Sequence, residues 1–348
     1  MIGTLHFAIP GDLATRSGGY GYDRRVIAEL RALGWQVVHL PLPCGFPRPD
    51  AAALAGAAQA LAGLPDGALV LVDGLAFGAM PDVVAAEAER LVFVALVHHP
   101  LSLETGLDAA TAVALAGSEK LALCFARQIV TTSPATAREL VAHFGVAEAR
   151  LSVAVPGTEA AAKAPGSGEV PVILAIGSLI ARKEHATLVA ALARIEDLAW
   201  RCRIVGDDGA DPAIAAALRS RIADLGLGDR VTLCGAIAET GPEYAGADIF
   251  ALASRYEGYG MVFAEALAHG LPVVGCAGGA VPDVVPSEAG TLVAPGDAVA
   301  FSEALRMMLA DPERRHTMAA AAHSAGQALP SWRQTADSLS RTLKKAMA

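Results

Sequence analysis

Short apolar runs alternate with helical patterns along nearly the whole chain, and this alternation constrains the fold most. Helical segments separate the strands expected in the first half, which lie near residues 3–9, 36–41, 68–73, 91–98, 128–132 and 151–155. The second half repeats the pattern, with strands expected near 171–177, 201–206, 230–234, 248–252, 272–275 and 291–293. Such alternation is typical of parallel sheets covered by helices on both faces. The sequence therefore predicts an α/β fold of two Rossmann-like, doubly wound parallel-sheet domains facing across a cleft.

The pattern restarts near residue 170, directly after the segment PGTEAAAKAPGSGEVP at 156–171. This segment is rich in Pro, Gly and Ala and has no apolar period, which is typical of a linker between domains. A surface loop inside one domain is the alternative. We expect one domain over residues 1–160 and a second over 170–330. Residues 331–348 should form a C-terminal helix, which can cross back to the first domain.

Composition limits the classes of function. Hydrophobic residues make up 53% and charged residues 18% of the 348, which favours a large core over disorder. The net charge of -9 makes nucleic acid an unexpected partner. Five scattered cysteines without a CxxC pair indicate free thiols in a reducing cytosol. With no signal-peptide pattern at the start of the chain, we expect a cytoplasmic protein whose membrane contact, if any, is peripheral.

Two glutamates, Glu257 and Glu265, stand in the otherwise apolar or small segment SRYEGYGMVFAEALAHGLPVV at 254–274. We expect a buried helix to start after the glycine-bearing turn and to end at Gly270. A buried carboxylate needs hydrogen-bond donors, and vicinal ribose hydroxyls would supply two. The free amides at the helix start favour an anion such as phosphate. The segment can therefore hold a nucleotide sugar, and a structural carboxylate paired with an arginine is the alternative.

Arg182 and Lys183 stand near the start of another expected helix, in the segment AIGSLIARKEH at 175–185. Cations at this end oppose the helix dipole, so a compensating anion is expected. A diphosphate ligand suits both side chains. A solvated pair is the alternative.

Gly18 and Gly19, in RSGGYGYDRR at 16–25, follow the first expected strand and let a ligand approach the backbone closely. An ordinary turn is the alternative. A dinucleotide fingerprint fits poorly, because Arg24 occupies its final glycine position and the second strand ends without an acidic residue. An NAD-dependent enzyme is therefore disfavoured.

His98 and His99 end the apolar run LVFVALVHHP at 91–100. Imidazoles at a strand end can donate to a hydroxyl or a phosphate. Because side chains alternate along a strand, only one of the two should point into the cleft. No third ligand at metal spacing is evident, so no metal site is predicted.

Together these segments resemble the retaining glycosyltransferases of family 4, which have the GT-B architecture. Glu257 and Glu265 match the family's E-x7-E pair, and GSLIARKEHATLVAAL resembles its GxLxxRKGxxxLxxA segment. The strings TTSPATARELVAHFGV, VAVPGTE and GGAVPDVV also match in kind and order, so the resemblance covers nearly the whole chain. Two departures stand out. Glu184 replaces the usual glycine, which leaves the local turn geometry open, and Ser178 stands where many members have arginine.

The resemblance implies donor-binding roles for individual residues. Glu265 would bind the ribose, and Glu257 would contact hydroxyls of the donor hexose. Arg182 and Lys183 would bind the diphosphate. The other implied donor-site residues lie by the phosphates, the sugar or the base: Gly18, Gly19, Gly206, Ala236, Ile237, Gly258, Tyr259, Gly260, Met261 and Val262.

The resemblance places the acceptor side in the first domain. His98 resembles the histidine that contacts the transferred sugar, with His99 as the rival placement. His99 and Glu104 are the acceptor-side candidates. Glu104 either binds an acceptor or caps the helix that follows it, and the cap is the favoured interpretation.

The implied activity is transfer of a hexose-type sugar from a nucleoside diphosphate donor, UDP- or GDP-linked, to a hydroxyl of a saccharide or lipid-linked acceptor in glycan or glycolipid synthesis. The catalytic candidates are His98, Arg182, Lys183 and Glu257. No cofactor or metal is expected, because cationic side chains and helix amides can neutralise the diphosphate. A hydrolysing nucleotide-sugar epimerase and a donor-binding protein without turnover are the alternatives.

Overall fold

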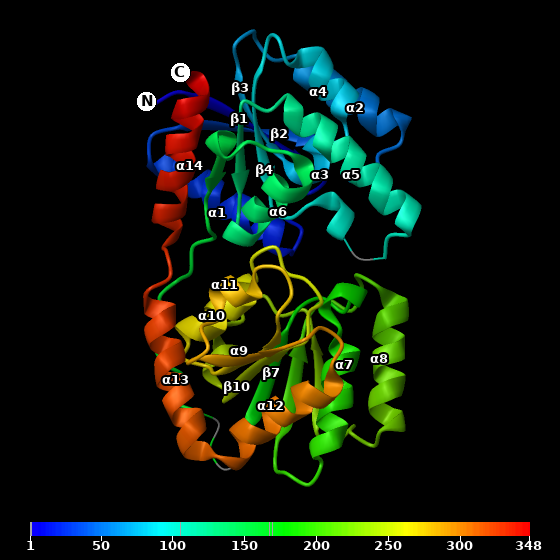
Figure 1. The fold of residues 1–348 in the computed structure, drawn as a ribbon, viewed down its shortest axis with the longest axis vertical. Coiled ribbons are helices and arrows are strands. Elements are labelled where there is room, and N and C mark those ends of the chain that lie inside the picture. The colour runs from blue at the N-terminus through cyan, green and yellow to red at the C-terminus, as the bar shows by residue number, and fades with distance from the viewer. Residues whose placement is uncertain (1, 105, 167, 169) are drawn as a thin grey trace. The chain divides into compact units, whose positions relative to one another are not determined.

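The computed structural model describes residues 2–104, 106–166, 168 and 170–348. Residues 167 and 169 of the expected linker lie outside this range. The chain forms two compact units, shown in Figure 1: unit 1 comprises Met1–Gly157 and Pro330–Ala348, and unit 2 comprises Thr158–Leu329. In the described residues, each unit is built on one parallel sheet of six strands, as the alternating pattern predicts.

Unit 1 has the strand order β2-β1-β3-β4-β5-β6. Its strands are β1 (Thr4–Pro10), β2 (Gln36–Leu42), β3 (Leu69–Asp73), β4 (Val92–Val97), β5 (Gln128–Thr131) and β6 (Leu151–Val153). Its helices are α1 (Gly18–Ala32), α2 (Ala51–Ala62), α3 (Gly74–Phe77), α4 (Pro81–Glu87), α5 (Ala109–Cys124), α6 (Pro134–Phe144) and α14 (Trp332–Met347), with short 3-10 turns η1 (Leu101–Leu103) and η2 (Glu148–Arg150).

Unit 2 has the strand order β12-β11-β10-β7-β8-β9. Its strands are β7 (Val172–Ile176), β8 (Arg201–Val205), β9 (Val231–Gly235), β10 (Ile249–Leu252), β11 (Val273–Cys276) and β12 (Gly290–Val293). Its helices are α7 (His185–Leu192), α8 (Pro212–Asp224), α9 (Gly241–Ala245), α10 (Met261–Ala268), α11 (Val281–Val284), α12 (Ala298–Ala310) and α13 (Pro312–Gln327), with 3-10 turns η3 (Ala181–Lys183) and η4 (Ala193–Ile195).

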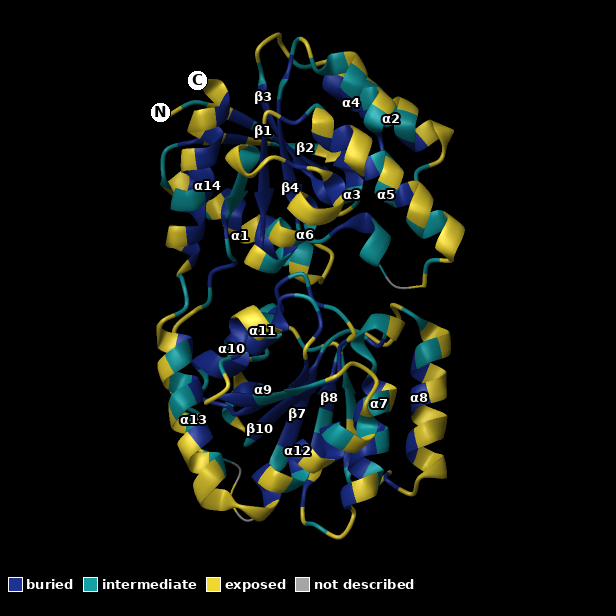
Figure 2. Ribbon diagram, in the orientation of Figure 1, coloured by how far each residue is buried: buried dark blue, intermediate teal, exposed yellow. Residues whose placement is uncertain are grey.

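The central strands carry the core of each unit, and Figure 2 shows them in the colour of buried residues. Strand β3 reads LVLVD and is buried at every position, and the same holds for β10, which reads IFAL. A parallel strand covered on both faces has no solvent side, so its side chains are apolar in both directions. This is why the strands appear in the sequence as continuous apolar runs.

Helix α14 completes unit 1 from the far end of the chain and packs against α1, β4 and β5 (Figure 1). Its first turn is stabilised by a capping box between Ser331 and Gln334. Its buried face includes Leu339 and Leu343. In addition, Trp35 donates a hydrogen bond of 2.9 Å from Nε1 to Oγ of Ser340. Among the described residues, no helix combines the length and the apolar character that crossing a membrane requires.

Candidate functional site

In unit 2 the strand order places the loops after β7 and β10 side by side. From β7 the chain runs to β8 and β9 on one side, and β10 then returns to the other side of β7. Crossovers in opposite directions open a crevice at the carboxyl ends of the two central strands, where ligands bind in open α/β sheets. The segments with the strongest predicted chemistry, residues 177–184 and 254–260, lie at this switch point.

Glu257 meets both predicted cations there. Nζ of Lys183 lies 2.6 Å from Oε1 of Glu257, and a guanidinium nitrogen of Arg182 lies 3.3 Å from Oε2. All three side chains are largely buried, so the two cations are not a solvated pair. Burial alone would raise the pKa of Glu257, but Lys183 and Arg182 outweigh it and the net pKa is lowered. The carboxylate is thus the compensating anion that cations near a helix start require.

The two loops are also tied through their backbones. The amide of Arg255 donates to the carbonyl of Arg182 at 2.9 Å, and the Arg182 guanidinium donates to the carbonyl of Tyr256 at 3.0 Å. Glu184 adopts the left-handed conformation, with φ of 47°, which a glycine would adopt without strain. Its carboxylate accepts hydrogen bonds from Arg255 and Thr187. The turn left open by the missing glycine therefore keeps glycine-like geometry.

Helix α10 starts at this crevice with its first amides uncapped by any side chain. Its N-cap Gly260 has φ of 93°, and a Cβ there would lie 2.9 Å from the Phe263 ring. Glycine is therefore required. Gly279 packs directly against the loop that carries Glu257. A Cβ added at Gly279 would lie 2.2 Å from the carbonyl oxygen of Glu257. The helix begins at Met261, after the glycine-bearing turn as the sequence predicts, and its free amides can bind an anion.

Glu265 lies within α10 and has a partner that the sequence did not reveal. The hydroxyl of Tyr244, in α9, lies 2.7 Å from Oε2 of Glu265, and the Tyr244 ring stacks on His269 at 4.9 Å. Burial raises the pKa of Glu265, and the Tyr244 hydrogen bond opposes this. The partner is therefore a tyrosine rather than the arginine of the structural alternative.

The predicted residues after β8 and β9 lie on the other side of β7. Gly206 follows β8, and a Cβ there would lie 1.9 Å from the carbonyl oxygen of Gly177. Backbone packing thus demands this glycine, whatever its role toward a ligand. Ala236 and Ile237 follow the end of β9. Gly258 and Tyr259 lie in the loop before α10, and Val262 lies in its first turn.

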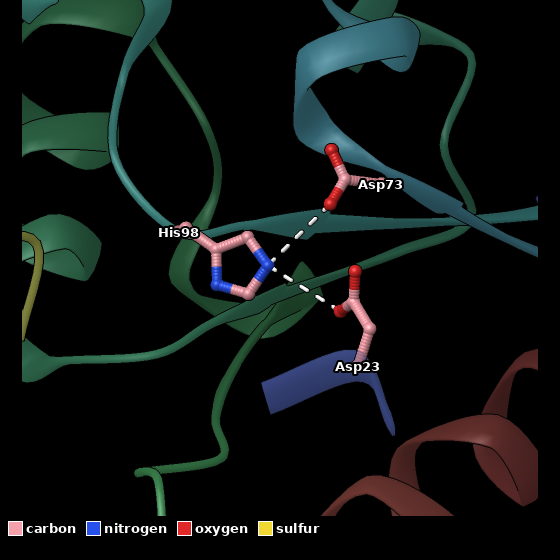
Figure 3. A group of neighbouring side chains, drawn as sticks. All are labelled: Asp23, Asp73 and His98. Carbon is pink, nitrogen blue, oxygen red and sulfur yellow. Dashed lines mark ion pairs between the residues drawn. The ribbon is translucent and has the colours of Figure 1, made fainter. Parts of the chain in front are cut away.

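In unit 1 the switch point lies between β1 and β3, and it holds a group of three polar side chains (Figure 3). Asp23 comes from α1, Asp73 ends β3, and His98 follows β4. Nε2 of His98 lies 3.5 Å from Oδ1 of Asp23 and 3.5 Å from Oδ2 of Asp73. The ligand atoms of the three lie within 4.8 Å of one another, close enough to hold one metal ion. Sequence reasoning missed both aspartates, because they stand far from His98 in the chain.

Of the remaining predicted residues of unit 1, Gly19 lies beside this group. Gly18 begins α1, and a Cβ on Gly19 would lie 3.6 Å from Cδ2 of His98. His99 does not join the group, since its Nε2 lies 3.0 Å from a carboxylate oxygen of Glu104. The expectation that Glu104 caps the next helix is wrong. Asp108 caps α5 instead, because its carboxylate lies one residue before the helix and accepts from the amide of Thr111.

Comparison with known proteins finds a family model and relatives that match part of the chain. Residues 170–311 match the family described as Glycosyl transferases group 1. The chain is 29% identical over 252 residues, 64% of its length and 58% of the relative's, to a D-inositol 3-phosphate glycosyltransferase of Kineococcus radiotolerans. It is 35% identical over 170 residues, 44% of its length, to a GDP-mannose-dependent alpha-(1-6)-phosphatidylinositol monomannoside mannosyltransferase of Mycobacterium tuberculosis, of which it covers 42%. The chain thus spans less than two thirds of these relatives.

Solved structures share the fold over the whole chain. The sucrose-phosphate synthase of Thermosynechococcus elongatus superposes with a TM-score of 0.82 at 23% identity and 98% coverage of both chains. Anabaena HepE in complex with UDP-glucose gives a TM-score of 0.78 at 18% identity, with 98% of this chain and 99% of the other covered. At these identities the likeness establishes the fold.

Proposed function

We propose that this chain, which has the GT-B fold, is a group 1 glycosyltransferase that transfers a hexose-type sugar from a nucleoside diphosphate donor to an acceptor hydroxyl. The donor is UDP- or GDP-linked, as UDP-glucose is bound by Anabaena HepE and one relative is GDP-mannose-dependent. The acceptor is a saccharide or a lipid-linked saccharide. The anomeric configuration of the sugar is retained.

The observation that carries the proposal is the group formed by Arg182, Lys183 and Glu257 at the switch point of unit 2. Two cations and one carboxylate leave a net positive charge, and the uncapped start of α10 adds partial positive charge beside it. A diphosphate is the ligand that best complements such a site. Glu265 and Glu257 supply acceptors for ribose and hexose hydroxyls.

The same residues can act on the transition state. When the bond between the sugar and the diphosphate breaks, negative charge grows on the leaving oxygens. Lys183, Arg182 and the α10 amides then interact more strongly than in the ground state, which lowers the barrier. Glu257 is engaged by two cations and is poorly placed to act as a free nucleophile. We therefore favour attack by the acceptor on the face from which the diphosphate departs, with the leaving phosphate accepting the acceptor's proton.

The first test measures binding of UDP, GDP, ADP and TDP to the full chain by thermal stabilisation and calorimetry. One diphosphate should bind clearly more tightly than the others. Lys183→Ala removes a charge-assisted contact worth about 1.5–3 kcal/mol, so affinity should fall about 10- to 100-fold. The matched control is Lys344→Ala, an exposed residue of α14. Equal affinity in wild type and Lys183→Ala would reject the site.

The second test follows turnover with the preferred nucleotide linked to glucose, mannose or galactose and a panel of saccharide acceptors. Transfer should require Lys183 and Glu257 and should persist in EDTA, because the proposed site neutralises the diphosphate without a metal. Epimerised sugar formed from the donor alone would identify an epimerase instead. Tight donor binding with no transfer to any acceptor would identify a donor-binding protein.

A further inference from the structure

The group at the switch point of unit 1 has a charge imbalance that its geometry must resolve. Asp23 and Asp73 are 0% and 1% exposed, and the side chain of His98 is 18% exposed. Two ionised carboxylates beside a neutral imidazole would place two negative charges in a site nearly closed to water. Burial of unpaired charge is costly, so the group must gain positive charge or protons. Figure 3 shows both carboxylates directed at the same ring nitrogen, Nε2 of His98.

The two carboxylates differ in their other contacts. Oδ1 of Asp73 accepts a hydrogen bond of 2.7 Å from the amide of Leu75. Among the described residues, neither carboxylate oxygen of Asp23 has a hydrogen-bond partner. Asp73 therefore has a backbone donor of its own, which Asp23 lacks. Asp23 is the carboxyl on which an additional proton costs least.

The ring of His98 is held in one orientation by its surroundings. The Tyr22 ring meets it edge-on, with centroids 5.3 Å apart, and Gly19 leaves space beside Cδ2. The hydroxyls of Thr132 and Thr136 both lie 3.3 Å from the carbonyl oxygen of His98. With Nε2 turned toward the carboxylates, Nδ1 lies on the opposite edge of the ring (Figure 3).

We propose that Asp23 and Asp73 hold His98 as an imidazolium of fixed orientation at neutral pH, with Asp73 as its counterion and Asp23 as a proton-sharing carboxyl. The two aspartates are positioning residues, since they act through His98. Nδ1–H of the cation can then donate to a sugar hydroxyl or a phosphate oxygen. Only this last step rests on the proposed function.

The electrostatic environment of these groups agrees with this assignment. Burial alone would lower the pKa of His98, but Asp23 and Asp73 outweigh it and raise the pKa to about 10. Burial raises the pKa of Asp23 to about 7, against the opposing effect of His98. Two phenols of α1, Tyr20 and Tyr22, also interact with the carboxylates. Burial is the main cause that raises the pKa of each phenol above its ordinary value, and the carboxylates add to it. No arginine or lysine is among the largest influences on the pKa of Asp23 or of His98 in the part of the chain that is described.

The experiment reads the charge of His98 directly. The full chain is labelled with 15N-histidine, and two-bond proton–nitrogen correlation spectra are recorded from pH 6 to 10, with His98→Gln identifying the signal. Both ring nitrogens of His98 should carry a proton at neutral pH. The ring should lose one of these two protons only in the alkaline range. In Asp23→Asn and in Asp73→Asn the midpoint should fall by about one pH unit or more. Asp82→Asn, an exposed carboxylate in α4, should leave it unchanged.

Two results would overturn the proposal. One is a neutral His98 at neutral pH in the wild-type chain. The other is a shift of the His98 signal on addition of one equivalent of Zn²⁺ or Mn²⁺, reversed by EDTA, because a metal ligand cannot keep a proton on Nε2. Asp73 caps helix α3, so Asp73→Asn can fail to fold. Asp23 caps no helix, and in that case Asp23→Asn alone decides the outcome.

The spectra separate this inference from the proposed function. A charged His98 in a chain that transfers no sugar would reject the proposed function and leave the assignment intact. Sugar transfer by a chain whose His98 is neutral would do the reverse. When both hold, kcat/KM of Asp23→Asn should decline above neutral pH while that of Asp82→Asn follows the wild type.

Discussion

Glu257 and Glu265 carry the same chemical group in two different environments. Glu257 is held ionised by Lys183 and Arg182, whereas Glu265 has an uncharged partner and a raised pKa. The difference follows from position. Glu257 lies in a loop that faces the loop of Lys183, whereas Glu265 lies inside helix α10 and contacts Tyr244 of α9. At the scale of residues, the contacts across the sheet decide what a carboxylate can do.

Tyr244 is expected to position Glu265. Removing its hydroxyl in Tyr244→Phe leaves a buried carboxylate without its donor, so the free energy of unfolding should fall by about 1–3 kcal/mol. Urea denaturation of the wild type, Tyr244→Phe, Glu265→Gln and the double variant gives four free energies of unfolding, which form a double-mutant cycle. The two single effects should not add. Additive effects would show that the hydroxyl and the carboxylate do not interact.

Glu119 in α5 gives a pH-dependent prediction. Its Oε2 accepts from the amide of Leu101 at 2.8 Å, and burial raises its pKa to about 8 against that hydrogen bond. Between its ordinary pKa of 4.5 and about 8, the folded chain keeps a proton that the unfolded chain has released. The free energy of unfolding should therefore fall as pH rises through this window, by at most about 1.4 kcal/mol per pH unit.

Glu119→Gln mimics the neutral acid and should remove most of that slope. Urea denaturation at several pH values between 5 and 8 measures it. Glu303→Gln, an exposed residue of α12, should keep the wild-type slope. An unchanged slope in Glu119→Gln would mean that Glu119 is ionised in the folded chain.

At the scale of elements, the switch point of unit 2 depends on two loops being tied to each other. Glu184 contributes through Arg255 in the facing loop, and it does so from a backbone conformation that disfavours side chains. The strained backbone at Glu184 is unfavourable, but it allows a carboxylate at this position to bind Arg255 and so to join the two loops. The family's usual glycine would have the same backbone geometry without the tie.

A glycine–alanine comparison separates these two effects. Glu184→Ala loses the carboxylate and keeps the strain, whereas Glu184→Gly loses the carboxylate and relieves the strain. The glycine variant should therefore be more stable than the alanine variant by about 1 kcal/mol. At Glu303, within α12, the order should reverse, because glycine disfavours a helix interior. The same order at both sites would contradict the left-handed turn.

At the scale of the molecule, the chain returns to unit 1 after completing unit 2. Helix α14 fills one side of the first sheet and buries Leu339, Leu343 and Ala346 completely. Unit 1 therefore cannot complete its core until helix α14 has been synthesised. Unit 2 is continuous in sequence and has no such dependence.

Leu343→Ala should destabilise unit 1 by about 2–5 kcal/mol. Tryptophan fluorescence reports the units separately, because Trp35 and Trp332 belong to unit 1 and Trp200 belongs to unit 2. In a Trp200→Phe background, Leu343→Ala should lower the urea midpoint of the remaining signal. Leu305→Ala, buried in unit 2, should leave that signal unchanged. A loss of unit 1 stability in Leu305→Ala would indicate that the two units unfold together.

The strands were predictable because each one is a local pattern. All twelve expected strands are confirmed in the described residues, with ends within a few residues. Helix α13 was not predicted, since PERRHTMAAAAHSAGQ has no clear apolar stripe, and two of its buried residues are the small Ala322 and Gly326. Short helices such as α9 and α11 were missed for a similar reason, because one turn leaves no period to detect.

The sequence by itself determined the two parallel sheets, the resemblance to a family and the segments that carry charge at the strand ends. Those properties can be inferred from apolar runs and short motifs, each of which lies within about twenty residues. Only the tertiary structure decided that Glu257 faces Lys183, that Tyr244 holds Glu265, and that Asp23 and Asp73 enclose His98. These pairs are joined by strand order rather than by spacing, and the order of strands in a parallel sheet is decided when distant crossovers pack together.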